Sequence, residues 1–235
     1  MKIAVISDLH YSRQKNLGCP ERLGERAPEL LARALQRLWE GGRPDVLLLG
    51  GDLVNDPDDD ALLAELSDIL NTAECPRIVI PGNHDPAPEV FYRYFPRPAA
   101  WQDIGGMRFL AFPDDAQTAG YNAFRSAEAL ETMVRAGKDS PFPLILFQHV
   151  PLFRRGTVAC PYNYDNADEI LEVAAKNGAV LSVSGHFHTG YIPSFCSPVA
   201  SVSAPSLCDR RFSFLVLELN GGGSLASCAF EYLGE

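Results

Sequence analysis

The first 85 residues alternate between short apolar runs rich in β-branched residues and segments whose apolar residues recur at helical spacing. The apolar runs are KIAVIS (2–7), DVLLLGGD (45–52) and RIVIPGNHD (77–85), and the helical segments between them are residues 27–40 and 58–70. Near-continuous apolar strands separated by helices are typical of parallel sheets that helices cover. This β-α-β-α-β order therefore predicts an α/β fold with parallel pairing and right-handed crossovers.

The alternation continues downstream and then stops. We expect strands at 108–112, 143–149 and 179–183, and helices at 126–137 and 166–178. In the last third, residues 210–220 and 224–233 lack helical periodicity and flank the turn sequence NGGG, which predicts a β-hairpin. Because the sequence has no internal repeat, low-complexity tract or clear linker, we expect one domain spanning residues 1–235.

The composition narrows the class of protein and its compartment. With 235 residues, 46% of them hydrophobic, the chain can bury a sizeable core without disulfides. No segment has the roughly 20 uninterrupted apolar residues of a membrane span, and Asp8 interrupts the first apolar run too early for a signal peptide. The six cysteines are scattered without CxxC pairs, so we expect reduced thiols and a cytoplasmic location.

The charge of the chain bears on its partners. The formal net charge is −10 and the pI is about 5.0. Nucleic-acid-binding proteins usually carry a basic face, so this balance argues against tight, non-specific binding of DNA or RNA. A local basic patch or bound cations can outweigh the global charge. Nothing in the sequence indicates an oligomeric state.

The five histidines all lie at the carboxyl end of an expected strand or directly after it. They are His10, His84, His149, His186 and His188. In open α/β sheets the carboxyl ends of the strands are where binding sites are built. A His-x-His pair such as the last two is a weak metal signal by itself. All five histidines at strand ends, with acidic residues and an asparagine beside them, indicate a metal site.

The blocks that carry these residues resemble a known family. Asp8-Leu-His10, Gly51-Asp52, Gly82-Asn83-His84-Asp85, Gln148-His149 and Gly185-His186-Phe187-His188 look like the five ordered motifs of the calcineurin-like metallophosphoesterases. Each block is weak alone, but five in this order are highly specific. The resemblance extends from residue 8 to residue 188, and it implies a four-layer α/β/β/α sandwich with a dinuclear metal site.

The resemblance also implies which residues hold the metals. The residues expected to hold one metal are Asp8, His10 and His188. The residues expected to hold the other are Asn83, His149 and His186. Asp52 would bridge them, together with a shared hydroxide that attacks phosphorus. Carboxylate and imidazole ligands suit two divalent transition metals, Mn, Fe or Zn, without fixing their identity.

His84 stands beside a ligand without matching one in the family pattern. The expected role of His84 is to protonate the leaving oxygen or to stabilise charge on it. Asp85 is a second catalytic candidate, although a turn-capping carboxylate is an equal alternative. Either Asp85 or Asn55 could orient His84.

The substrate residues are expected on loops around the metals. The candidates are Arg13, Arg154 and Tyr162, with Arg155, Arg210 and Arg211 as further cations nearby. An arginine can bind phosphate bidentately, but for each of these arginines a solvated surface position is the favoured interpretation. The tyrosine-rich loop 160–166 could stack on a base or cover the site, and its tyrosines could also be packing residues.

Three functions remain open at this point. The leading hypothesis is a phosphodiesterase or phosphomonoesterase acting on a small molecule or nucleotide. A nuclease on the same scaffold is the alternative, against which the acidic charge argues. A non-catalytic scaffold is a third, but such scaffolds tend to lose ligands or the catalytic histidine, and here the set is intact. The second block, GDLVNDP, also lacks the arginine that is typical of protein phosphatases. Repair nucleases usually have a histidine at the position that Asn55 occupies here.

Overall fold

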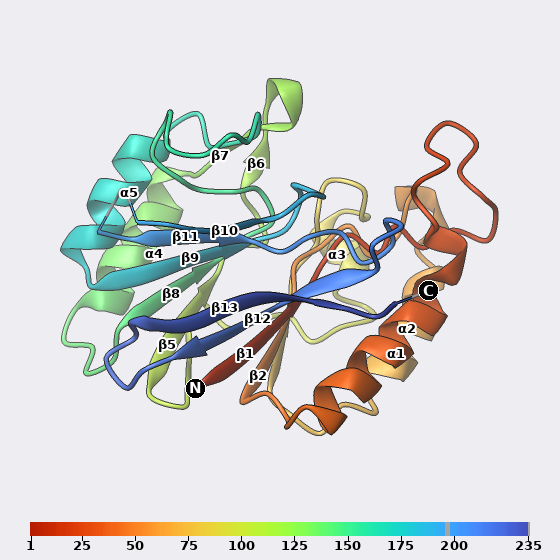
Figure 1. Ribbon diagram of the computed structural model, residues 1–235. Helices are drawn as coiled ribbons and strands as arrows, with labels where there is room; N and C mark the ends of the chain where they lie inside the picture. The colour runs from red at the N-terminus through yellow and green to blue at the C-terminus, as the bar shows by residue number, and fades with distance from the viewer. Residues whose placement is uncertain (196–197, 235) are drawn as a thin grey trace.

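Two β-sheets face each other at the centre of the protein, and helices cover their outer faces (Figure 1). The computed structural model describes residues 1–195 and 198–234. The first sheet has the strand order β13-β12-β1-β2-β3. Its strands are β1 (Lys2–Ile6), β2 (Val46–Leu49), β3 (Arg77–Val79), β12 (Ser213–Leu219) and β13 (Leu225–Tyr232).

The second sheet has the order β10-β11-β9-β8-β5-β4. Its strands are β4 (Gln102–Ile104), β5 (Met107–Ala111), β8 (Leu144–Phe147), β9 (Ala179–Ser184), β10 (Tyr191–Ser194) and β11 (Ala200–Ser203). A separate short hairpin is formed by β6 (Ala116–Gln117) and β7 (Ala123–Phe124). The helices are α1 (Ala27–Glu40), α2 (Leu62–Leu70), the short α3 (Pro88–Phe91), α4 (Ala127–Gly137) and α5 (Ala167–Lys176).

The apolar runs of the sequence are continuous because the central strands are buried on both faces. In β1, Ala4 and Ile6 belong to the core under α1 and α2, whereas Ile3 and Val5 belong to the core between the two sheets. A third core lies between the second sheet and helices α4 and α5. Since side chains alternate along a strand, each central strand supplies two cores at once. The expected four-layer α/β/β/α sandwich is confirmed.

The expected pairing is also confirmed for the central strands. β1, β2 and β3 are parallel, as are β5, β8 and β9. The C-terminal hairpin forms around the NGGG turn, and β12 inserts antiparallel beside β1. The helix expected at 58–70 begins only at Leu62, because residues 57–59 form a 3₁₀ turn capped by the Asp56 carboxylate. The pattern did not indicate β4, β6, β7, β10 or α3, which are short.

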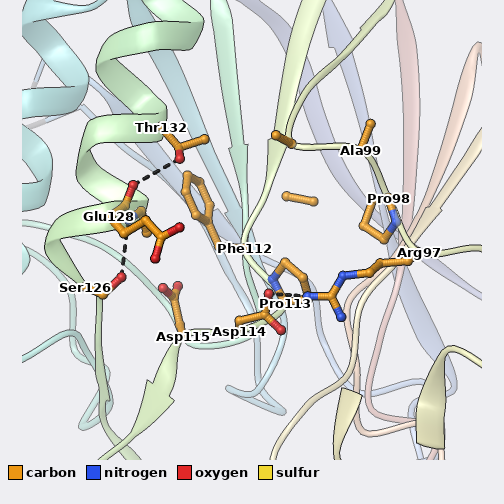
Figure 2. Close-up of a pocket in the computed structure, with 13 residues that line it drawn as sticks. Arg97, Pro98, Ala99, Phe112, Pro113, Asp114, Asp115, Ser126, Glu128 and Thr132 are labelled. Carbon is orange, nitrogen blue, oxygen red and sulfur yellow. Dashed lines mark hydrogen bonds and ion pairs between the residues drawn. The ribbon is translucent and has the colours of Figure 1, made fainter. Parts of the chain in front are cut away.

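A buried ion pair supports the strand that ends at the site. The guanidinium of Arg125 is fully buried, pairs with Asp115 at 2.7 Å, and stacks 3.5 Å from the centre of the Phe112 ring. It also lies 3.4 Å from Oε1 of Gln148, the last residue before His149. Asp115 and Phe112 line a cavity of about 340 Å³ beside α4 (Figure 2). This network therefore fixes the end of β8 from the side opposite the first sheet.

The sequence predicts no membrane span and reduced cysteines. None of the helices in residues 1–195 and 198–234 combines the length and the apolarity needed to cross a bilayer. Five cysteines within those ranges are free, and the sixth, Cys196, lies outside the described residues.

Candidate metal centre

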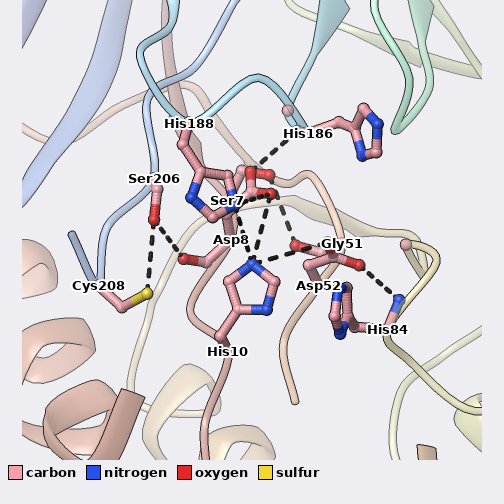
Figure 3. A network of polar contacts seen from close by, with 12 residues as sticks. Ser7, Asp8, His10, Gly51, Asp52, His84, His186, His188, Ser206 and Cys208 are labelled. Carbon is pink, nitrogen blue, oxygen red and sulfur yellow. Dashed lines mark hydrogen bonds and ion pairs between the residues drawn. The ribbon is translucent and has the colours of Figure 1, made fainter. Parts of the chain in front are cut away.

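The predicted ligands come together where the carboxyl ends of β1, β2, β3, β8 and β9 meet, and their side chains form overlapping groups. Figure 3 shows five of them, Asp8, His10, Asp52, His186 and His188. In the first group, His10 Nε2 lies 3.0 Å from His188 Nε2. Asp8 Oδ1 lies 3.5 Å from His188 Nε2 and 3.9 Å from His10 Nε2. Three donor atoms from two segments of the chain, the loops after β1 and β9, thus surround one point.

The second group lies beside the first. His149 Nε2 is 3.1 Å from Asn83 Oδ1 and 3.1 Å from His186 Nδ1. Asp52 stands between the two groups, because its Oδ2 is 3.7 Å from His10 Nε2 and 3.4 Å from His149 Nε2. This position suits a carboxylate that bridges two cations.

In three of the histidines, the ring nitrogen that points away from the site donates a hydrogen bond, which determines whether the nitrogen that points into the site has a lone pair. His149 Nδ1 donates to the Gly50 carbonyl at 2.6 Å, His186 Nε2 donates to the Tyr121 carbonyl at 3.0 Å, and His188 Nδ1 donates to Asp209 Oδ2 at 3.2 Å. A neutral imidazole that donates at one nitrogen presents a lone pair at the other. When His149 is neutral, its lone pair and that of His186 therefore face each other at 3.1 Å.

Facing lone pairs repel unless a positive charge lies between them. Asp8 Oδ1 reinforces this requirement, since it is buried and has no hydrogen-bond partner within the described part of the chain. Buried unpaired carboxylate oxygens are costly unless paired with a cation. The residues present therefore fit two divalent cations, and the outer hydrogen bonds are those that orient metal-bound histidines.

Burial and charge give Asp52 and His186 the protonation states that cation binding needs. Burial and the neighbouring His149 lower the pKa of His186 to about 3, which leaves its ring neutral. Burial alone would raise the pKa of Asp52, but the charges of His149 and His10 outweigh it and hold that pKa well below the ordinary value. Neutral imidazoles and an ionised carboxylate are the forms that bind metals. Burial would lower the pKa of His149, but the Asp52 carboxylate outweighs it and raises that pKa to about 9, so a cation must displace a proton from this ring.

Strained backbone directs several ligands into the site. Asp8, His10, Asp52 and His186 have positive φ angles of 57°, 44°, 53° and 65°. Such angles are unfavourable for residues other than glycine and persist only where surrounding contacts impose them. Here the contacts are backbone hydrogen bonds of 2.9 Å that join the loop after β1 to the loop after β2, from Asp8 N to Gly51 O and from His10 N to Asp52 O.

His84 lies at the same site and is held differently. Its Nδ1 donates to the backbone carbonyl of Asn55 at 2.8 Å, and its ring packs edge-on against His10 with centroids 4.8 Å apart. Of the two residues that could orient His84, the contact is therefore made by Asn55, through its main chain.

Asp85 binds backbone amides. Its Oδ1 accepts from Leu53 N at 2.8 Å and Val54 N at 3.0 Å, and its Oδ2 accepts from Gly82 N at 2.8 Å. The expected catalytic role of Asp85 finds no support in these contacts, which are those of the alternative, a capping carboxylate. They tie the loop after β2 to the loop after β3.

A pocket of about 520 Å³ opens over the metal-binding groups. It is lined by His10, Arg22, Asp52, Asn83, His84, Tyr121, Tyr162, His186, Phe187, His188 and Thr189. Of the expected substrate residues, Tyr162 lies in this lining, whereas Arg13 and Arg154 are exposed and absent from it. Arg210 and Arg211 line a neighbouring pocket of about 230 Å³ that shares His188 and Thr189.

Arg22 is a residue of the pocket that the motif blocks did not indicate. Its Nη1 donates to Asn55 Oδ1 at 3.2 Å, and its Nε is buried without a hydrogen-bond partner in the described part of the chain. No carboxylate of the described residues lies within ion-pairing distance of its guanidinium. The sequence shows only that residue 22 is a cation, and this does not distinguish it from the other arginines of the chain.

Comparisons with known proteins agree with this geometry. The model of the calcineurin-like phosphoesterase family matches residues 1–190. A protein of a Synechococcus strain named "Probable cyclic nucleotide phosphodiesterase" is 32% identical over 201 residues, which cover 82% of this chain and 75% of that protein. The 3',5'-cyclic adenosine monophosphate phosphodiesterase of Haemophilus influenzae is 27% identical over 195 residues, which cover 80% of this chain and 70% of that protein.

Two solved structures show the same fold. A dimetal phosphatase of Danio rerio superimposes with a TM-score of 0.78 at 13% identity, covering 100% of this chain and 99% of that one. A purple acid phosphatase from yellow lupin superimposes with a TM-score of 0.59 at 13% identity, covering 99% of this chain and 53% of that one.

Proposed function

The chain belongs to the calcineurin-like phosphoesterase family and is a hydrolase of phosphoesters, and we propose that its reaction is the hydrolysis of a phosphodiester bond in a small molecule. The observation that carries the proposal is that ring nitrogens of His149 and His186 point toward each other beside Asp52. The pocket above them also contains the guanidinium of Arg22, which has no carboxylate partner among the described residues. Both curated relatives have names that specify cyclic nucleotide phosphodiesterases, which supports a diester over a monoester.

The residues proposed to hold one cation are Asp8, His10 and His188, and those proposed to hold the other are Asn83, His149 and His186, with Asp52 between them. When bound, two transition metals such as Mn, Fe or Zn supply positive charge that acidifies a water and offsets the charge of phosphoryl oxygens. The chain itself provides the anionic bridge, the neutral imidazoles and the hydrogen bonds that orient them.

His84 and Arg22 have separate proposed roles. With Nδ1 of His84 committed to the Asn55 carbonyl, Nε2 is the atom that can deliver a proton to the departing oxygen. The guanidinium of Arg22 can bind a phosphoryl oxygen, because planar N–H donors match phosphate geometry. Asn55 positions both groups, one through its carbonyl and the other through its side chain.

The alternative functions fit the site less well. A groove of about 440 Å³ is lined by Asn83 and His149 and also by Asp114 and Asp115, which pair with Arg97 and Arg125, and its lining contains no lysine or arginine. A nucleic-acid backbone would need basic residues along such a groove. A non-catalytic scaffold would have no need of the strained ligand loops or of a free His84 Nε2.

The test is a phosphoester panel on protein stripped of metal and reloaded with Mn, Fe, Zn or Mg. We expect turnover of cyclic nucleotides and bis-p-nitrophenyl phosphate with at least one transition metal, and slower turnover of p-nitrophenyl phosphate. Degradation of single-stranded DNA in preference to these diesters would favour the nuclease, and no turnover with any metal would favour the scaffold. The single-domain organisation and the cytoplasmic location stay predictions.

A further inference from the structure

One wall of the metal-centre pocket is aromatic. Tyr121, Tyr162 and Phe187 line it together with the ring of His186. The Tyr162 ring lies edge-on to His186 with centroids 4.5 Å apart, and its centroid is 6.4 Å from that of Tyr121 and 6.4 Å from that of Phe187. The pocket therefore has a polar floor, with His84 and Arg22 among its lining, and an aromatic wall.

Two segments distant in sequence fasten to each other and hold the two tyrosines. Tyr121 ends the turn between β6 and β7, and Tyr162 lies in the loop before α5. Asn163 N donates to Asn122 Oδ1 at 3.0 Å, and Ala123 N donates to Asn163 O at 3.2 Å. Each tyrosine is thus next to a residue of this junction, so the pair is held in a fixed arrangement.

The backbone at Tyr121 is strained. Its φ is 61°, in the left-handed region that a bulky side chain rarely adopts. Its carbonyl accepts the hydrogen bond from His186 Nε2 at 3.0 Å, so the turn is anchored to a proposed metal ligand. Strain of this kind is retained where surrounding structure imposes it, and it gathers at functional sites.

The side chain of Tyr121 does little for the core. It is 57% exposed, and within residues 1–195 and 198–234 no hydrogen bond engages its hydroxyl or that of Tyr162. A large aromatic ring that lines a pocket and is more than half exposed offers a stacking surface. Every nucleobase has a flat π-face that such rings bind, whereas a sugar phosphate alone has none.

Resting on the proposed phosphodiesterase function, we propose that Tyr121 and Tyr162 form a subsite for the base of a nucleotide substrate. The base lies along the aromatic wall while the phosphodiester lies over the metal-binding groups. The pocket volume of about 520 Å³ is within the range that holds small ligands of this size.

The test compares substrates that differ only in the base. Adenosine 3',5'-cyclic phosphate and ribose 3',5'-cyclic phosphate are assayed with the metal-loaded wild type and with Tyr121→Asn and Tyr162→Leu. Asparagine tolerates the left-handed backbone at position 121, and leucine keeps an apolar side chain at position 162. We expect kcat/KM for the adenosine substrate to fall roughly 5- to 100-fold more than kcat/KM for the ribose substrate, which is the effect of losing one base–aromatic stack.

Phe124→Asn is the matched control, because Phe124 is an exposed aromatic residue of the same hairpin that is outside the pocket lining. A second arm measures the binding of adenosine 5'-monophosphate and ribose 5-phosphate by calorimetry, which requires no turnover. Equal losses on both substrates, or a wild type that binds both monophosphates equally, would overturn the subsite. If the wild type hydrolyses neither cyclic phosphate, the proposed function fails, and the calorimetry still decides on the subsite.

Discussion

His84 and the metal-binding histidines differ in how their ring nitrogens are used. His149, His186 and His188 each direct one nitrogen outward to an acceptor and the other inward to a neighbouring ligand. His84 also donates at Nδ1, to the Asn55 carbonyl, but no hydrogen bond within the described residues engages its Nε2. We therefore propose that the same residue type holds cations at these three positions and at His10, and that His84 is available for proton transfer.

Replacing His84 should separate chemistry from metal binding. We expect His84→Ala to lower kcat roughly 100- to 10,000-fold on a diester with an alkoxide leaving group, the usual contribution of a general acid. On a diester whose leaving group is p-nitrophenolate the loss should be smaller, because that anion departs without a proton. The metal-to-protein ratio, measured by elemental analysis, should equal that of the wild type, and a variant depleted of metal would contradict the assigned role.

Arg22 differs from the exposed arginines in having an unpartnered buried Nε at the pocket. We expect Arg22→Ala to lower kcat/KM about 10- to 100-fold, because a hydrogen bond to a charged group contributes about 1.5–3 kcal/mol. Arg13→Ala, which removes an exposed arginine outside the pocket lining, is the comparison in the same kinetic assay. A larger loss in Arg13→Ala than in Arg22→Ala would favour the residue that the sequence indicated.

The loops after the strands are packed against one another as closely as the strands themselves. Asp85 joins the loops after β2 and β3 by three backbone hydrogen bonds. Gly185, between β9 and the His-x-His pair, allows the loop after β9 to approach the end of β1. A Cβ at Gly185 would overlap the Ser7 hydroxyl and lie 2.9 Å from Asp8 Oδ2.

Gly185→Ala is therefore expected to displace Asp8 and His186 while the sheets remain folded. Overpacking of this kind costs about 1–3 kcal/mol of unfolding free energy. Metal affinity, measured by titration, should fall, and the far-UV circular dichroism spectrum should match that of the wild type. Gly222→Ala, in the β12–β13 turn where a Cβ would meet nothing within 4 Å, is the control. Unchanged metal affinity in Gly185→Ala would show that the close approach is dispensable.

Long periodic elements could be predicted from the sequence, and short ones could not. Helix α1 occupies residues 27–40 as expected, since its apolar stripe continues over 14 residues. Strands such as β6 and β7 have two residues each, too few for a periodic pattern, and their pairing depends on contacts with the 163–165 loop. Tyr121, which lies between them, was missed for this reason.

The assembled molecule concentrates buried acidic groups and lone pairs at one edge of its two sheets. Asp8 is fully buried and Asp52 nearly so, and within residues 1–195 and 198–234 the histidines are the only cationic side chains within ion-pairing distance of either carboxylate. A ligand that binds only the folded state stabilises it by about 2.7 kcal/mol at 100 times its dissociation constant. Metal binding should therefore contribute measurably to the stability of the whole fold.

Metal removal should lower the melting temperature of the wild type by roughly 5–10 °C, since 1 kcal/mol corresponds to about 2–4 °C for a chain of this size. The measurement is calorimetry of the protein as purified, after chelation, and after reloading with Mn or Zn. Reloading should restore the melting temperature of the wild type. The same melting temperature in all three states would contradict a metal centre coupled to the fold.

The sequence by itself determined the central strands, the main helices and the proposed ligand set, because periodicity and ordered motifs are local properties of the chain. The family resemblance extended this to the arrangement of four layers. Only the tertiary structure decided that Asn55 orients His84, that Asp85 ties loops together, and that Arg22 and Tyr121 line the pocket. These roles depend on contacts between residues up to 65 positions apart, such as Tyr121 with His186, and no local pattern records them.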